Sequence, residues 1–185
     1  MKLRWKGVVS AALFFLFVGC GNNEGNKLIT MEGVGNLTFD QEVPNMGKGY
    51  TVVADAMYFD DNQDDPYFVV EDKSGNPVAR VFSGQAVEVF SPEFRTEAGI
   101  HPDMKLYEAA KIAGEDNLYI WLAWPETYFM IDDCTNGFSW KVEGRLLIGG
   151  DEKFQQISQS GTPATLADFL PDARISSITV YKQRE

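Results

Sequence analysis

Apolar and polar residues alternate along much of this 185-residue chain with a period of two, which is typical of β-strands that bury one face. Valine, isoleucine, tyrosine and phenylalanine concentrate between clusters of turn-forming residues, and each such stretch predicts a strand. The predicted strands are residues 50–59, 67–71, 78–82, 85–91, 117–124, 127–132, 138–142, 145–148 and 174–181, with a weaker edge strand within 28–39. Turn-forming residues 72–77 join two of these strands into a predicted hairpin.

Helical spacing of apolar residues is clear in one segment only. Its apolar positions are Leu106, Ala109, Ala110 and Ala113. Asp103 is the expected N-cap of this helix, and Gly114 is expected to end it. A short second helix is predicted over residues 163–170, with Thr162 as its N-cap and Pro171 after it.

These elements predict an α+β fold. We expect a largely antiparallel, twisted sheet of about seven or eight strands, with the main helix packed on a face and the short second helix beside it. Phe138 and Trp140 alternate with Ser139 and Lys141, so the sheet should have one face in the core and one in water. Residues 28–185 are expected to form a single domain.

The first twenty residues follow a separate pattern. Three cations precede an apolar run over residues 7–18, which is too short to span a bilayer, and the run ends at Gly19 and Cys20. This ending resembles the bacterial lipobox, in which a cysteine after a small residue is acylated and becomes the mature N-terminus. The resemblance implies a lipoprotein signal peptide over residues 1–19. The alternatives are an ordinary secretory signal and an uncleaved anchor.

The same resemblance sets the expected location. Cys20 would carry the lipid, for example palmitate, and the glycine- and asparagine-rich residues 20–27 would form a flexible tether. Gly21 after the cysteine implies, within the lipoprotein family, release to the outer membrane. We therefore expect a lipid-anchored protein of the bacterial cell envelope.

Net charge excludes some partners. Removing the three cations of the signal from the formal charge of −11 leaves −14 on the rest of the chain. A domain of that sign repels nucleic-acid backbones and anionic lipid headgroups, so nucleic-acid binding is not expected and membrane contact should come from the lipid.

Aromatic residues suggest a surface that binds sugar rings or peptides. Tyr119 and Trp121 lie on one face of a predicted strand, and Trp140 lies on another. Such rings stack on sugars and on hydrophobic peptides. Leu118 and Ile120 occupy the other face of the first strand, so core packing is the competing interpretation of all three rings.

Four residues match part of a calcium-binding loop. Asp60, Asn62, Asp64 and Glu71 fall at positions 1, 3, 5 and 12 of a twelve-residue loop. Position 6 is Asp65 instead of glycine, and the flanking segments are predicted strands instead of helices. The competing interpretation is an acidic, solvated hairpin loop.

A cysteine-dependent hydrolase is the remaining enzymatic hypothesis. With Cys20 acylated, Cys134 has no disulfide partner, and His101 is the single histidine of the chain. We expect Cys134 to be buried or inert and His101 to be a loop residue, and therefore no enzyme.

A further resemblance covers about 25 residues. Small outer-membrane lipoproteins of unknown function carry a similar strand-loop-helix segment, and accessory lipoproteins of the outer-membrane β-barrel assembly machine are more distantly similar. The matching residues are Ser91, Pro92, Thr96, Gly99, Ile100 and Met104. This resemblance implies a non-catalytic envelope role in binding or assembling a partner. A carbohydrate-binding lipoprotein is the alternative.

Overall fold

The structure is a computed structural model that describes residues 27–58, 64–123 and 128–183. Its strands are β1 Leu28–Thr30, β2 Gly33–Val34, β3 Leu37–Thr38, β4 Thr51–Tyr58, β5 Asp64–Glu71, β6 Pro77–Phe82, β7 Ala86–Val89, β8 Arg95–Thr96, β9 Leu118–Ala123, β10 Tyr128–Asp133, β11 Phe138–Glu143 and β12 Ser177–Tyr181. The α-helices are α1 Leu106–Ala113 and α2 Gly150–Ser160, and the 3-10 helices are η1 Glu115–Asn117, η2 Gly144–Leu146 and η3 Leu166–Asp168.

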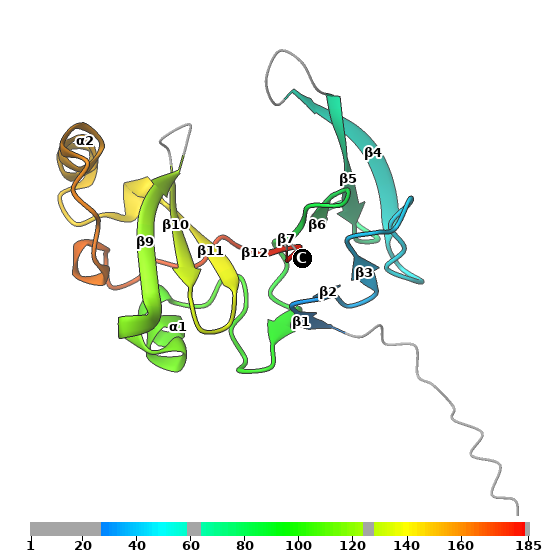
Figure 1. Cartoon of the computed structure of the whole chain (residues 1–185), viewed down its shortest axis with the longest axis horizontal. Coiled ribbons are helices and arrows are strands. Elements are labelled where there is room, and N and C mark those ends of the chain that lie inside the picture. Colours follow the sequence, from blue (N-terminus) through cyan, green and yellow to red (C-terminus); the bar gives the residue numbers. More distant parts are fainter. Residues whose placement is uncertain (1–26, 59–63, 124–127, 184–185) are drawn as a thin grey trace, which may run out of the picture.

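An eight-stranded sheet forms the frame of the molecule. Its order is β4-β5-β6-β7-β12-β11-β10-β9, and every neighbouring pair is antiparallel. The last strand, β12, therefore lies between the β4–β7 half and the β9–β11 half. The sheet is strongly bent, so that β9–β11 stand on one side and β4 and β5 on the other (Figure 1).

A second, four-stranded sheet was not expected. Its order is β3-β2-β1-β8, and β1 pairs in parallel with β8. The weakly patterned residues 28–39 supply three of its strands instead of one edge strand of the large sheet. The coarse prediction of a mixed α+β fold is confirmed, but the finer picture of one sheet with one main helix is wrong.

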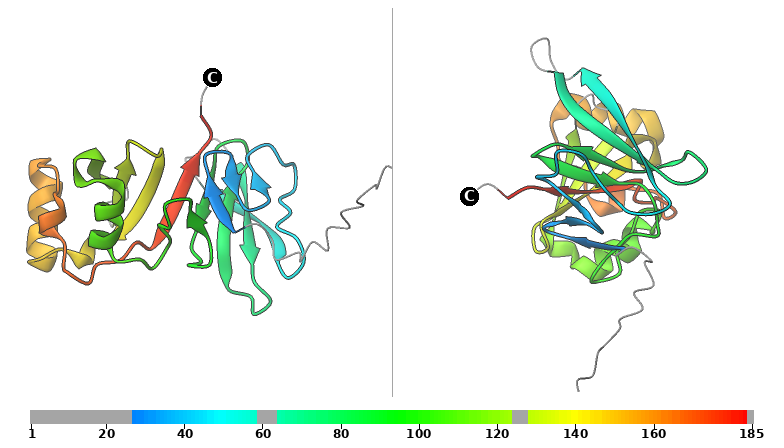
Figure 2. Two further views of the ribbon diagram at one scale, coloured as in Figure 1. Left: turned by 90° about the horizontal axis from the view of Figure 1, so that it is seen from below. Right: turned by 90° about the vertical axis from the view of Figure 1, so that its right-hand side faces the viewer.

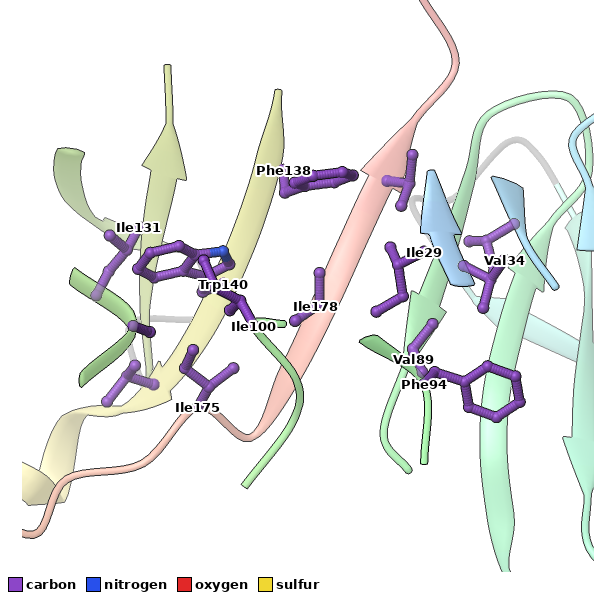
Figure 3. Close-up of a cluster of buried hydrophobic side chains, with 14 of the residues drawn as sticks. Ile29, Val34, Val89, Phe94, Ile100, Ile131, Phe138, Trp140, Ile175 and Ile178 are labelled. Atoms are coloured by element: carbon purple, nitrogen blue, oxygen red, sulfur yellow. The ribbon is translucent and has the colours of Figure 1, made fainter. Parts of the chain in front are cut away.

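One face of the large sheet holds the core. Alternate residues of the central strands point into it, among them Trp140, Ile178 and Val89, and all three are fully buried. Figure 3 shows Ile131 and Trp140 toward one end of this cluster, and Val34 of the small sheet and Phe94 toward the other. We call this side of the sheet the covered face.

The helices and the small sheet pack on the covered face. The buried side of α1 joins the same core cluster, and Phe154 of α2 meets Phe129 of β10 edge to face with ring centres 6.0 Å apart. Strand β2 contacts β7. Figure 2 shows both helices at the β9–β11 end of the molecule and the small sheet beside β4–β7. None of the helices in these described ranges is long and apolar enough to cross a membrane.

Two helix predictions need correction. Asp103 has a φ of 68°, which lies in the left-handed region and cannot form an N-cap, because that position needs an extended backbone. The cap position is Lys105, and the backbone N–H of Leu106 instead donates to the carbonyl of Ala173 at 2.8 Å. Gly114 ends the helix as predicted.

The second helix lies earlier in the chain than predicted. Residues 163–170 contain only the short η3, which begins with a capping box between Thr165 and Asp168. Helix α2 occupies Gly150–Ser160 instead, between Gly149 and Gly161 in left-handed conformations. The predicted strand at 145–148 is also wrong, because η2 and a single bridge from Leu147 to Phe169 replace it.

Candidate functional site

The other face of β9–β12 carries polar and aromatic side chains, and we call it the open face. Its residues alternate with the core residues, and none belongs to the core cluster. The residues that matter below are Tyr119, Trp121, Asp132, Ser139, Lys141, Thr179 and Tyr181. The predicted wet face of the 138–142 strand is found only in part: Trp140 is fully buried on the covered face and Lys141 is half-buried on the other, but Ser139 beside it is buried, because the bent sheet shelters the middle of this face.

The three predicted ring residues separate onto opposite faces. Tyr119 is 58% exposed and Trp121 37% exposed on β9, so the core interpretation is wrong for these two. Trp140 is 0% exposed, so its place in a binding platform is wrong. Register explains the difference: Trp140 pairs with Ile131 on the core side, whereas Trp121 pairs with Met130 on the other side. Tyr181, 45% exposed on β12, also lies on the open face, as does the half-buried Tyr128 of β10.

A groove of about 370 Å³ crosses one end of the open face. Trp121 lies in its wall and donates its indole Nε1–H to Oδ2 of Asp132 at 2.9 Å. The hydroxyl of Ser139 donates to Oδ1 of the same carboxylate at 2.6 Å. Tyr181 also lines the groove, so all four strands from β9 to β12 contribute lining residues. The two hydrogen bonds fix the Asp132 carboxylate and the Trp121 ring relative to each other.

Burial and nearby carboxylates raise the pKa values of two tyrosines of this face, and Lys141 places its Nζ 4.2 Å from the ring centre of one of them, Tyr128. Partial burial raises the pKa of Tyr181, and the negative charges of Asp132 and Glu88 raise it further. Burial, followed by the charge of Glu88, also raises the pKa of Tyr128. Tyr128 lies on β10 and Glu88 on β7, three places apart in the sheet order. Because the sheet is bent, the charge of Glu88 still acts on Tyr128.

The proposed cysteine and histidine of a hydrolase lie in different loops. Cys134 is exposed in the turn after β10, so of the two expected alternatives, buried or inert, burial is wrong and inertness stays a prediction. Its backbone N–H donates to the carbonyl of Asn117 at 3.0 Å. His101 precedes α1, and its Nδ1 lies 2.6 Å from the carbonyl oxygen of Pro102. Within the described residues, no hydrogen bond joins the side chains of Cys134 and His101.

The predicted calcium ligands are only partly within the described residues. Asp60 and Asn62 lie outside them, as does Cys20, the predicted acylation site. Asp64 begins β5 and Glu71 ends it. An extended strand rises about 3.3 Å per residue, so these two positions are roughly 23 Å apart. Glu71 therefore cannot share one ion with Asp64. Calcium binding by the remaining loop oxygens stays a prediction.

Sequence reasoning missed Asp132, Ser139 and Tyr181. Asp132 of β10 stands opposite Ser139 of β11. Ser139 stands opposite Thr179 of β12, and Tyr181, two residues further along β12, is therefore diagonal to Ser139. The sequence signal that could have found them is the alternation of polar and apolar residues in β10, β11 and β12, combined with the register of the hairpin formed by β10 and β11. Without the position of β12 in the sheet, that signal could not join Tyr181 to Trp121.

Comparisons with known proteins add the fold and nothing more specific. No protein-family model matches the chain, and no match was found among the curated proteins. A solved structure of similar fold is the crystal structure of the uncharacterized protein yfeY from Escherichia coli, with a TM-score of 0.56 and 13% identity. The similarity covers 83% of this chain and 98% of that one. At this identity it shows a shared fold alone.

Proposed function

We propose that this protein is a lipid-anchored, non-catalytic protein of the bacterial cell envelope that binds a partner through the open face. Its lipid on Cys20 would hold it to the membrane, in the outer membrane by resemblance. The exposure of Tyr119 and Trp121 on the edge strand β9, facing away from the core, is the observation that carries the binding role. Both helices and the small sheet pack on the covered face, so these elements leave the aromatic side accessible.

Anchoring has a matched control within the chain, because the sequence holds two cysteines. Cys20→Ala should remove the protein from the membrane fraction, whereas Cys134→Ala should leave it attached. Mass spectrometry should find an acylated N-terminal cysteine in the wild type and in Cys134→Ala. An unacylated N-terminus, or a Cys20→Ala variant that stays in the membrane fraction, would contradict anchoring through Cys20.

Partner binding is tested by site-specific photo-crosslinking in living cells. A crosslinker in place of Tyr119 should give one defined adduct, because this side chain lies on the open face. The same crosslinker in place of Ile112, which is 46% exposed on α1, should not give that adduct. Equal adducts from both positions, or none from Tyr119, would contradict a role for the open face.

A carbohydrate ligand is the second candidate. The specific observation in its favour is that Tyr119 and Trp121 are both exposed on one strand, where stacked rings bind sugars. The platform would use Tyr181 where the sequence suggested Trp140. If Tyr119→Ala combined with Trp121→Ala left glycan binding unchanged, this candidate would be rejected.

A further inference from the structure

The same side of the sheet, continued over β5–β7, already binds a basic side chain of this chain. The guanidinium carbon of Arg80 lies 5.4 Å from the ring centre of Tyr67 and 5.2 Å from that of Phe90. Its Nη1 donates to Oε2 of Glu88 at 3.2 Å, and the hydroxyl of Ser177 donates to Oε1 of the same carboxylate at 2.7 Å. Here a carboxylate oriented by a serine, together with aromatic rings, holds a guanidinium.

The groove near β9 repeats the acceptor half of that arrangement. Asp132 accepts one hydrogen bond from Ser139 and one from Trp121. A carboxylate has about four acceptor positions, so Asp132 retains capacity for further donors. The groove also has two aromatic rings, Trp121 and Tyr181, as the Arg80 site has Tyr67 and Phe90. The described residues that line the groove include two aspartates and no lysine, arginine or histidine.

Charge decides which ligand suits this groove. The chain without its signal carries −14, and the acids around Tyr181 make the field at the groove negative. An anionic ligand would be repelled. A neutral sugar presents donors and acceptors together, whereas the groove side chains offer mainly acceptors. A cation satisfies both the aromatic faces and the carboxylate.

We propose that the groove binds an arginine or lysine side chain from an extended basic segment of a partner protein. The cation would stack on Trp121 and donate hydrogen bonds to Asp132. The groove residues come from β9 to β12, a width of three strand spacings or roughly 14 Å, which is the length of about four extended residues. This inference rests on the proposed function, since it specifies the chemistry of the partner that the open face binds.

The test uses the full lipidated chain in a non-ionic detergent and a fluorescently labelled arginine-serine repeat peptide. Fluorescence anisotropy should show binding that weakens with added salt. A peptide with neutral citrulline in place of arginine should bind at least about tenfold more weakly, because it lacks the charge. Asp132→Asn should weaken binding of the arginine peptide by a similar factor. Glu152→Gln, on exposed α2, removes the same charge away from the groove and should have little effect.

Three outcomes would overturn the inference. Equal weakening by Asp132→Asn and Glu152→Gln would mean diffuse charge attraction without a site. Equal binding of the citrulline and arginine peptides would remove the role of the cation. Binding of a neutral N-acetylglucosamine oligomer in preference to the arginine peptide would identify a glycan groove. Each of these leaves anchoring through Cys20 and crosslinking at Tyr119 unaffected, so failure here is distinct from failure of the proposed function.

Discussion

Two tryptophans of the same molecule show how strand register decides the role of a residue. Trp121 and Trp140 lie on strands separated only by β10. Trp140 aligns with Ile131 and Ile120 on the covered face, whereas Trp121 aligns with Met130 on the open face. Because successive side chains of a strand alternate in direction, a shift of one residue exchanges core and surface. The same residue type therefore lies in the core at one position and at the surface at the other.

The two tryptophans should differ sharply in their contribution to stability. Trp140→Ala removes a fully buried ring and should lower the free energy of unfolding by about 3–5 kcal/mol. Trp121→Ala removes a partly exposed ring and one hydrogen bond, and should cost no more than about 1 kcal/mol. Urea unfolding followed by circular dichroism measures both.

A third variant refines this comparison. The indole Nε1 of Trp140 is buried without a hydrogen-bond partner within the described structure. Trp140→Phe keeps most of the apolar ring and removes this unsatisfied donor, so it should cost clearly less than Trp140→Ala. Equal costs for Trp121→Ala and Trp140→Ala would mean that the assigned faces are wrong.

At the scale of elements, strands were predicted better than helices. The strands of the large sheet carry a strong alternation, and their predicted positions agree with the structure within a few residues. Helix α2 carries a weak signal because its sequence is mostly polar, with Phe154 and Ile157 as its main contacts with the core. Tertiary packing of those two side chains, together with the left-handed Gly149 and Gly161 at its ends, determines where this helix forms.

Helix α2 is also tied to the segment that follows it. Lys153 of α2 pairs with Asp168 of η3 at 3.0 Å. Burial of Asp168 by itself raises its pKa. Hydrogen bonds from the backbone and side chain of Thr165 and from Lys153 outweigh this effect, and hold the pKa below the usual 3.8. The charged form of Asp168 therefore stabilises the folded state.

This pKa shift predicts a pH dependence of stability. A carboxyl group with a lowered folded-state pKa contributes stability above its unfolded pKa of 3.8, and that contribution is lost as the pH falls through the folded value. Asp168→Asn should therefore cost about 1 kcal/mol at neutral pH and progressively less below about pH 4. Urea unfolding at a series of pH values measures this. Asp172→Asn, at an exposed neighbour, is the control, and a cost for Asp168→Asn that is independent of pH would contradict the prediction.

At the scale of the whole molecule, strand order was the information that sequence pattern did not contain. The alternation of residues identified the strand at the C-terminus but not its neighbours. In the structure, β12 pairs with β7 through Ile178 and Val89 and with β11 through Ile178 and Trp140. The open face, and with it the groove between Trp121 and Tyr181, exists only because this last strand lies in the middle of the sheet.

The position of β12 predicts that the two halves of the sheet do not hold together without it. Ending the chain after Ile175 would leave β7 and β11 with unpaired edges and would expose the buried side of Trp140. We expect this truncated chain to show red-shifted, readily quenched tryptophan fluorescence and no cooperative unfolding transition. Ending the chain after Lys182 keeps β12 and its bond from the Lys182 N–H to the Gln85 carbonyl, so that control should unfold like the full chain. A cooperative transition in the shorter chain would mean that one half folds independently, and β12 would then join two domains instead of completing one core.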